Sequence, residues 1–507
     1  IKPMDDYNPF YYSGQKINTP LATILLNTNY QVRHSTNHTG FIEIEPIKNL
    51  RFKSQFTYYM YQRHTYRYYP STLPAKVEGE GGEAYRAEYD DHNLLTENTL
   101  SYLKTLDSGH TFDGLLGFTG QRLSSNDFSL NGKGYMDDNV KWNNMNAVQD
   151  KQTYSASSST SKRTKMSLLA RFNYNYKQRY YLTVTGRYDG ASNFAANNKW
   201  GFFPSAALAW RMSSENFMES TKSWLDDLKL RISYGTAGNN NIPSDQTSTI
   251  WSAGSGASIG WMNNMSSYWT TGAQMANPDL KWETTHTRNA GLDFTLLNGK
   301  LSGTVEYYWN TTKDLLINFP VSGVGYSFQY RNLGETENKG WEVTLNWNAI
   351  NKKNYALSFN ANVGFNKNKV KSLGSLMDYS ADSGWASTDI QSDFKVQPGH
   401  SVGEIYGFVS DGRYEVSDFE GFIDGKWVLK AGVADASDII GEKYLRPGAM
   451  KLKNVDGSED NKVTKDDQKV IGDTNPFCSG GFSVNARVYG FDLTANFTYS
   501  IGNDIYN

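Results

Sequence analysis

The sequence alternates apolar and polar residues with a period of two over many segments of about ten residues. In residues 179–189, apolar side chains stand at Tyr180, Leu182 and Val184, and Thr, Arg and Asp stand at most of the positions between them. Successive side chains of a β-strand point to opposite faces. Each of these segments is therefore predicted to be a strand with one apolar face and one polar face.

The predicted strands come in pairs joined by tight turns. Asn298-Gly299 separates residues 290–296 from residues 301–309, and Asn-Gly favours the positive φ angles of a type I′ hairpin turn. Residues 351–354 and Gly490 mark two further turns. The other pairs are 42–44 with 50–58, 100–102 with 112–118, 168–174 with 179–189, and 200–212 with 227–235, the last across a connection near 215–224 that is expected to hold a short helix. Seven hairpins predict about 14 strands, each near the roughly 10 residues that a tilted membrane strand needs.

Long polar connections separate these hairpins at 62–91, 124–161, 237–280, 311–337 and 368–477. Outer-membrane barrels alternate short periplasmic turns with long external loops in this way, whereas the loops of a β-sandwich are not sorted so regularly. A propeller would repeat one motif, and none is found. The predicted fold is all-β, a transmembrane antiparallel up-and-down β-barrel with long extracellular loops, of which 368–477 forms the longest loop region.

Composition argues against several other classes of protein. No apolar run approaches the roughly 18 residues of a membrane-spanning helix. The formal charge of −2 argues against a nucleic-acid binder with a basic face. Aromatic residues make up 14% of the chain, which argues against disorder. Trp200, Trp210, Trp309 and Trp341 stand at strand ends, where they are expected to form interfacial girdles. The lone Cys478 excludes disulfides within the chain.

Residues 456–467 form the best candidate for a metal site. The spacing resembles an EF-hand-like calcium loop, in which positions 1, 3, 5, 7, 9 and 12 supply oxygen ligands. These positions are Asp456, Ser458, Asp460, Lys462 (through its carbonyl), Thr464 and Asp467. Asn461 replaces the usual Gly at position 6, a mild departure because Asn tolerates the left-handed conformation. We expect a structural Ca²⁺ that stiffens an external loop; the alternative is a solvated acidic turn.

Enzymatic signals are weak. The seven His residues form no H-E-x-x-H motif, and no nucleophile elbow or paired-carboxylate arrangement is evident. No catalytic residue is therefore assigned. Trp251, Trp261, Tyr268 and Trp269 lie among Gly, Ser and Asn in residues 237–280, where they could stack on a sugar ring or a peptide side chain. The alternative is packing against neighbouring loops or a partner protein.

Several longer motifs resemble the SusC/RagA-like TonB-dependent outer-membrane transporters. They occur in the order of that family and cover about residues 165–507. They are Trp200-Gly201-Phe202-Phe203-Pro204-Ser205-Ala206, residues 228–235 with Gly238-Asn239, Asn277-Pro278-Asp279-Leu280-Lys281-Trp282-Glu283, Asn338-Lys339-Gly340-Trp341-Glu342, Arg446-Pro447-Gly448 and Gly502-Asn503-Asp504-Ile505-Tyr506-Asn507. The family often carries a calcium loop at the place of residues 456–467.

The resemblance implies a barrel of about 22 strands with an N-terminal plug, in the outer membrane of a Gram-negative cell. It implies a SusD-like lipoprotein lid, TonB as the energy source, and import of a large nutrient. An oligosaccharide is the first candidate for this nutrient. The alternatives are peptide import by the same machinery and, outside transport, a structural or adhesive surface barrel. About 14 strands cannot close such a barrel, so residues 1–507 are expected to be a portion of one, without the plug and the closing strands. Arg187, Arg231, Asp293 and Glu306, on the polar parity, are expected to face the lumen.

Overall fold

A single antiparallel sheet dominates the computed structural model, which describes residues 11–12, 15–18, 20–73, 81–149, 151–255, 267–321, 325–381, 393–458 and 460–505. Among these residues the sheet has 14 strands. In chain order they are β3 (Thr28–Ile47), β4 (Leu50–Tyr69), β5 (Gly82–Thr105), β6 (His110–Tyr135), β7 (Ser155–Tyr176), β8 (Tyr180–Ala191), β9 (Trp200–Arg211), β10 (Leu225–Asn239), β13 (Glu283–Leu296), β14 (Leu301–Lys313), β17 (Glu335–Asn351), β18 (Tyr355–Ser372), β27 (Cys478–Val488) and β28 (Phe491–Ile501). The predicted seven hairpins and about 14 strands are confirmed.

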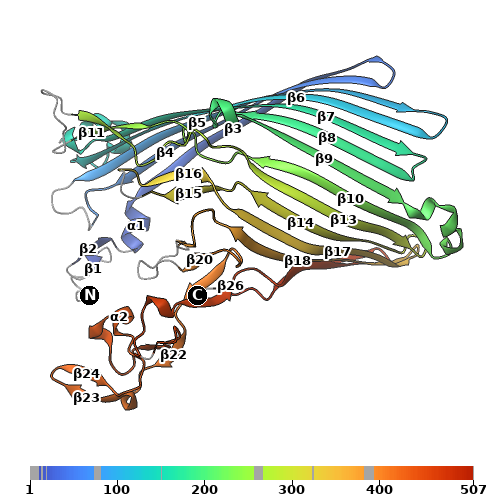
Figure 1. The fold of residues 1–507 in the computed structure, drawn as a ribbon. Helices are drawn as coiled ribbons and strands as arrows, with labels where there is room; N and C mark the ends of the chain where they lie inside the picture. Colours follow the sequence, from blue (N-terminus) through green and yellow to red (C-terminus); the bar gives the residue numbers. More distant parts are fainter. Residues whose placement is uncertain are drawn as a thin grey trace.

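Each strand between the two edges of the large sheet pairs with the strands that precede and follow it in that order, as in an up-and-down barrel. The sheet curves into a trough, with its short turns at one end and its long connections at the other (Figure 1). Within the described residues, β3 and β28 stand at the two edges and do not pair with each other. No helix among the described residues is long and apolar enough to cross a membrane.

The strands of the first half are longer than the sequence predicted. β4, β5 and β6 have 20, 24 and 26 residues, so much of 62–91 and 124–161 is strand and not loop. The alternation of apolar and polar residues marks only the part of a strand that borders lipid, because a part that water reaches on both faces can be polar throughout. The long-end connections shrink accordingly to 70–81, 136–154, 240–282, 314–334 and 373–477, and a further one, 192–199, is short.

The tight turns follow the predicted chemistry. In the β13–β14 hairpin the Lys300 N–H donates to the Leu297 carbonyl at 3.4 Å, and Asn298 and Gly299 have φ angles of 55° and 77°. Positive φ at both central residues defines the type I′ turn expected of Asn-Gly. The β9–β10 connection contains 3-10 helices at Met212–Ser214 and Asn216–Thr221, so the short helix expected there is present.

One face of the sheet exposes large apolar side chains. Phe202, Leu208, Ile232 and Leu493 are 63%, 51%, 51% and 63% exposed, and they share a parity with the apolar residues of neighbouring strands. In a soluble sandwich this face would be covered by a second sheet. An extended apolar face on so many adjacent strands requires another apolar medium, which is the acyl region of a bilayer.

Smaller elements lie at the long-loop end. They include β1 (Tyr11–Tyr12), β2 (Gln15–Asn18), α1 (Pro20–Leu26), β11 (Trp251–Ser255), β12 (Ser267–Thr271), β15 (Leu316–Pro320) and β16 (Phe328–Asn332). The region between β18 and β27 holds β19 (Tyr379–Ala381), β20 (Phe394–Val396), β21 (Glu404–Gly407), β22 (Ser410–Arg413), β23 (Phe419–Ile423), β24 (Lys426–Leu429), α2 (Ser437–Ile440), β25 (Met450–Leu452) and β26 (Lys469–Asp473). Tyr414, Phe419, Ala436, Leu452 and Val463 form a small buried core there. The predicted loop region is thus a compact subdomain.

The apolar face makes a prediction about single charges. Leu345 stands midway along the apolar part of β17 and is 40% exposed, whereas its neighbour Thr344 points to the opposite face. In the full-length protein, Leu345→Arg should lower the free energy of unfolding by about 2–4 kcal/mol, because an arginine at the midplane faces acyl chains. Thr344→Arg is the matched control and should change it far less. Urea-induced unfolding in lipid vesicles measures both, and equal losses would contradict the assignment of the two faces.

Candidate functional site

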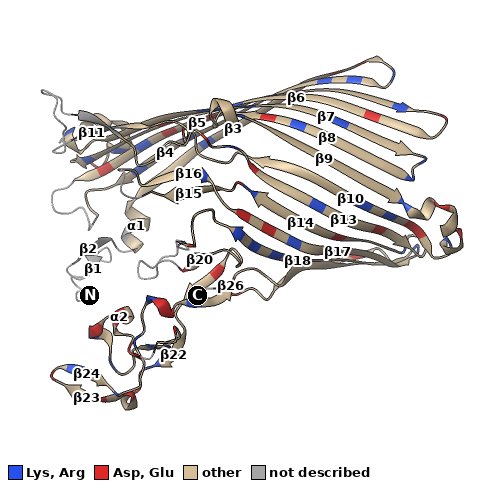
Figure 2. Ribbon diagram, in the orientation of Figure 1, with Lys and Arg blue, Asp and Glu red and all other residues tan. Residues whose placement is uncertain are grey.

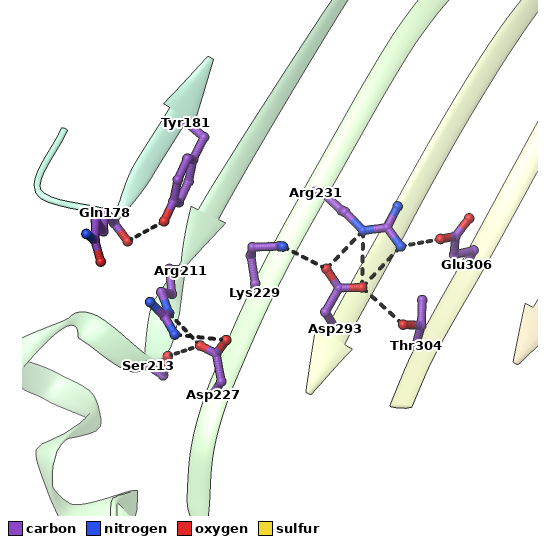
Figure 3. Close-up of polar contacts among 10 residues, drawn as sticks. All are labelled: Gln178, Tyr181, Arg211, Ser213, Asp227, Lys229, Arg231, Asp293, Thr304 and Glu306. Atoms are coloured by element: carbon purple, nitrogen blue, oxygen red, sulfur yellow. Dashed lines mark hydrogen bonds and ion pairs between the residues drawn. The ribbon is translucent and has the colours of Figure 1, made fainter. Parts of the chain in front are cut away.

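The polar face of the sheet carries two groups of ion pairs toward the short-turn end (Figure 3). Arg211 at the end of β9 binds Asp227 of β10 through Nε at 2.7 Å and Nη2 at 3.2 Å. The Ser213 hydroxyl donates to the same carboxylate at 2.7 Å. Paired charges lose little by facing a water-filled interior, so this wall suits a wet lumen and not lipid.

A second group of charges joins three neighbouring strands. Asp293 of β13 accepts from Arg231 Nε at 3.1 Å and lies 3.1 Å from Lys229 Nζ, both on β10. Arg231 also reaches Glu306 of β14, two strands away. Gly291 makes this reach possible, because it pairs with both Arg231 and Glu306 and a Cβ on it would lie 2.8 Å from Arg231 Cζ. The arginine therefore lies flat across the intervening strand.

The predicted lumen residues are brought to one face. Arg231, Asp293 and Glu306 form the network just described, and Arg187 on β8 binds Asp189 at 2.8 Å and Ser167 of β7 at 3.0 Å. A hollow of about 540 Å³ lies against this wall, and Tyr181, Arg211 and Lys229 are among the residues that line it.

On β17 and β18 the same face is rich in amides toward the long-loop end. Asn366 and Asn368 of β18 donate to Asn338 Oδ1 of β17 at 3.4 and 2.8 Å. The Tyr308 hydroxyl of β14 crosses Gly340 and donates to Asn366 Oδ1 at 2.9 Å. Amide groups offer donors and acceptors without net charge, which is the chemistry that hydroxyl-rich or amide-rich ligands need.

Sequence reasoning placed single residues on this face but missed how they connect. Asp227 and Lys229 stand on the predicted polar parity, but their partners were not predicted, and neither were Arg211 and the two glycines that Arg231 and Tyr308 cross. A signal for them exists: acidic and basic residues recur at polar-parity positions of consecutive strands, and Gly291 and Gly340 fall at the same parity between them.

The predicted calcium loop folds as a hydrogen-bonded ring of oxygens. Ser458 N donates to Asp456 Oδ1 at 2.7 Å, and Ser458 Oγ donates to Asp460 Oδ1 at 2.9 Å. The Asn454 amide donates at 3.1 Å both to Ser458 Oγ and to the Lys462 carbonyl. Since one amide nitrogen donates to both oxygens, these two predicted ligands lie close to each other.

Asp467 plays a different part from the one its spacing suggested. It is fully buried, and its carboxylate accepts from the backbone N–H groups of Val455 (2.5 Å), Asp456 (3.0 Å) and Thr464 (2.7 Å). Its acceptor capacity is therefore largely used within the loop. In the described part of the chain, no group of three or more His, Cys, Asp or Glu side chains is arranged to hold a metal. Any cation here would depend on the hydroxyl and carbonyl oxygens together with Asp456 and Asp460.

The aromatic residues proposed for ligand stacking are only partly described. Trp251 is 59% exposed at the start of β11. β11 pairs with β12, which puts Trp269 opposite Ala253 and Tyr268 opposite Gly254. Three of the four predicted residues thus belong to one hairpin at the long-loop end, and Trp261 lies outside the described residues.

The Asp467 contacts predict both a mutant effect and a pH dependence. Burial alone would raise the pKa of Asp467, but the N–H groups of Thr464, Val455 and Asp456 hold this pKa below its usual value. The stabilisation is therefore complete above the unfolded-state pKa of about 3.9 and is lost as the pH falls through the lower folded-state pKa. Asp467→Asn should destabilise the loop by about 2 kcal/mol or more, because its amide replaces an acceptor by a donor.

Hydrogen exchange of the Val455, Asp456 and Thr464 amides, without added metal, measures this effect. Exposed Asp466→Asn removes the same charge one residue away and should leave these amides protected. Unchanged protection in Asp467→Asn would contradict the role given to the carboxylate.

Comparison with known proteins gives a consistent result. A family model described as TonB dependent receptor-like, beta-barrel, matches residues 3–507. "TonB-dependent receptor P3" of Formosa agariphila is 30% identical over 504 residues, covering 97% of this chain and 47% of the relative. "TonB-dependent receptor SusC" of Bacteroides thetaiotaomicron is 33% identical over 320 residues, covering 62% of this chain and 31% of the relative. The chain spans about half the length of the relatives that match it along most of its length.

Among solved structures, that of the RagAB peptide transporter superimposes with a TM-score of 0.78 at 23% identity, covering 98% of this chain and 51% of that chain. At this identity the likeness concerns the fold. Together with the exposed apolar face and the polar opposite wall, these matches confirm the resemblance found in the sequence. The chain belongs to the TonB dependent receptor-like β-barrel family.

Proposed function

We propose that the protein containing this chain imports a large nutrient, an oligosaccharide, across the outer membrane with energy supplied through TonB. The observation that carries the proposal is the two-faced sheet, in which 14 strands present an exposed apolar belt on one side and a wall of paired charges and amides on the other. A barrel built in this way encloses water and can pass a polar solute.

The nature of the luminal wall favours a neutral, hydroxyl-rich solute. Asn338, Asn366 and Asn368 lie where an incoming solute would first meet the wall, and they carry no charge. The charged residues below them are already paired with each other. Exposed Trp251 at the same end offers a flat apolar surface of the kind that stacks on sugar rings.

Peptide import by the same machinery is the second candidate, because side-chain amides also pair with peptide groups. The relative whose structure is named a peptide transporter shares the fold at 23% identity, which does not carry its substrate to this chain. A structural or adhesive surface barrel would need neither TonB nor a lid.

We propose a SusD-like surface lipoprotein as the lid, placed over the long-loop end where β11 and β12 lie.

Growth assays test the proposal and separate its alternatives. A strain lacking the gene should lose growth on one or a few glycans as sole carbon source and should regain it from a plasmid copy. Loss of growth on peptides with normal growth on all glycans would instead establish peptide import. Unchanged growth on every glycan and peptide would contradict import altogether. Because import is coupled to TonB, a strain lacking TonB should lose growth on the same nutrients as the strain lacking the gene.

We further propose that residues 456–467 bind Ca²⁺ through the oxygens of Asp456, Ser458, Asp460 and Lys462, with Asp467 holding the loop closed from inside. The convergence of Ser458 Oγ and the Lys462 carbonyl on the Asn454 amide supports this. In the full-length protein, calcium chloride should protect this loop from limited proteolysis, and Asp460→Ala should abolish the protection.

The control for this experiment is Asp424→Ala, which removes an exposed acid from the β23–β24 turn of the same subdomain. It should retain the calcium-dependent protection. If calcium fails to change the cleavage rate of the unmodified protein, the loop is an acidic turn and not a metal site.

A further inference from the structure

The residues on the lipid-facing side of the sheet change abruptly from apolar to basic near the long-loop end. On β18 this parity reads Phe359, Ala361, Val363 and Phe365, and then Lys367, Lys369 and Lys371. Figure 2 shows basic residues gathered along the part of β18 nearest β20. These lysines do not face the lumen, because the alternate residues Asn366 and Asn368 form the amide cluster of the polar wall.

The strand register extends the basic zone across neighbouring strands. One hydrogen-bonded row of the sheet runs through five strands from β10 to β18. Its members are Tyr234, Arg288, Trp309, Lys339 and Lys367. The next row toward the short turns is entirely apolar or aromatic. Its members are Ile232, Ala290, Tyr307, Trp341 and Phe365. The boundary between the two chemistries is therefore continuous around this part of the wall.

The height of this boundary fits the edge of a bilayer. Along β18, Tyr355 and Phe365 are ten residues apart, which is roughly 25 Å along the barrel axis at about 3.3 Å per residue and a tilt of about 40°. The apolar band of an outer-membrane barrel is also about 25 Å tall. The row of Arg288, Lys339 and Lys367 consequently lies at the level of the headgroups in the outer leaflet.

Most of the charge in this row is not neutralised by the protein. Arg288 stacks on Trp309, with Cζ 4.7 Å from the ring centroid. Lys339 has one carboxylate partner, Glu337, at 3.4 Å, and Glu337 is nearly buried and also accepts from Trp309 Nε1 at 3.0 Å. Among the described residues, no carboxylate lies within 4.0 Å of Lys367 or Lys369. The zone therefore keeps a net positive charge.

A cavity of about 880 Å³ adjoins these lysines. Tyr307, Trp341, Phe365 and Phe477 line it together with Lys339, Lys367 and Lys369, and Asn366 and Asn368 of the amide cluster line it as well. Glu404 and Asp473 also line it; Glu404 lies 2.9 Å from His400 and Asp473 accepts from the Ser401 hydroxyl at 2.8 Å, and the three lysines outnumber these two carboxylates. A cavity that brings aromatic and basic side chains together matches an amphiphile with an anionic head.

We propose that Arg288, Lys339, Lys367 and Lys369, named here the basic collar, bind the phosphate groups of a phosphorylated glycolipid of the outer leaflet, whose acyl chains lie along the apolar row below. Charge complementarity supplies the attraction, and it is strengthened near a membrane surface that concentrates anionic headgroups. Lysine and arginine stems can lie on the apolar row while their charged ends reach the headgroups. The proposal rests on the outer-membrane location alone and does not depend on which nutrient is imported.

The test uses the full-length protein purified from outer membranes in detergent, with lipid A as the probe. Binding is followed by native mass spectrometry and by titration of intrinsic tryptophan fluorescence. The triple variant K339Q/K367Q/K369Q should bind lipid A at least about tenfold more weakly. The matched control is K352Q/K353Q, which removes two exposed lysines from the turn at the opposite end of the same two strands. It should bind like the unmodified protein.

Two further probes identify the chemistry that is recognised. Dephosphorylated lipid A should bind as weakly to the unmodified protein as lipid A binds to the triple variant, and inorganic phosphate alone should not compete at millimolar concentration. Equal affinity of the triple variant for lipid A, equal loss in the control variant, or full competition by inorganic phosphate would overturn the proposal. Retained lipid A binding with loss of a co-purifying lipoprotein would also overturn it and would assign the collar to a protein partner. Heat-modifiable migration on gels verifies that each variant is a folded barrel.

Discussion

The need to satisfy every backbone hydrogen bond without water explains most of this structure. In a hydrocarbon medium an unpaired N–H or C=O group costs several kcal/mol, so each strand must be bonded on both sides. The meander from β3 to β28 does this for twelve strands, each held by its chain neighbours. Once the backbone is satisfied, the side chains on the lipid face can be fully apolar and exposed, as Phe202 and Leu493 are.

Close pairing of the strands also shapes the polar wall. Neighbouring strands are less than about 5 Å apart, so a long side chain either stands upright in the lumen or lies across the next strand. Arg231 over Gly291 and Tyr308 over Gly340 take the second course. Each places its polar end on a strand that it does not adjoin, which couples three strands through side chains as well as through the backbone. The side chains of this wall therefore lie flat and contact each other, and the space in front of the wall is left to solute and water.

Much of the fold could be predicted because its determinants are local. The period of two and turn residues such as Asn298-Gly299 report directly on strands and hairpins, so the strand number and the two faces followed from the sequence. The lengths of β4 to β6 did not, because alternation disappears where both faces meet water. The Arg231–Glu306 contact depends on register across two strands, and the inward role of Asp467 depends on which N–H groups the folded loop leaves unpaired. Neither is encoded in spacing alone.

Parity and height together decide which medium each side chain meets. Asn366 and Lys367 are adjacent in sequence, yet one belongs to the amide cluster of the wall and the other to the basic collar. At this height β18 is therefore neutral on its luminal face and cationic on its outer face. Neither contact with the lumen nor contact with hydrocarbon explains both faces. A cation on the outer parity costs little only where the headgroups begin, because their anions replace the water that it would otherwise lose. We therefore infer that these lysines lie at the upper boundary of the membrane on the barrel surface.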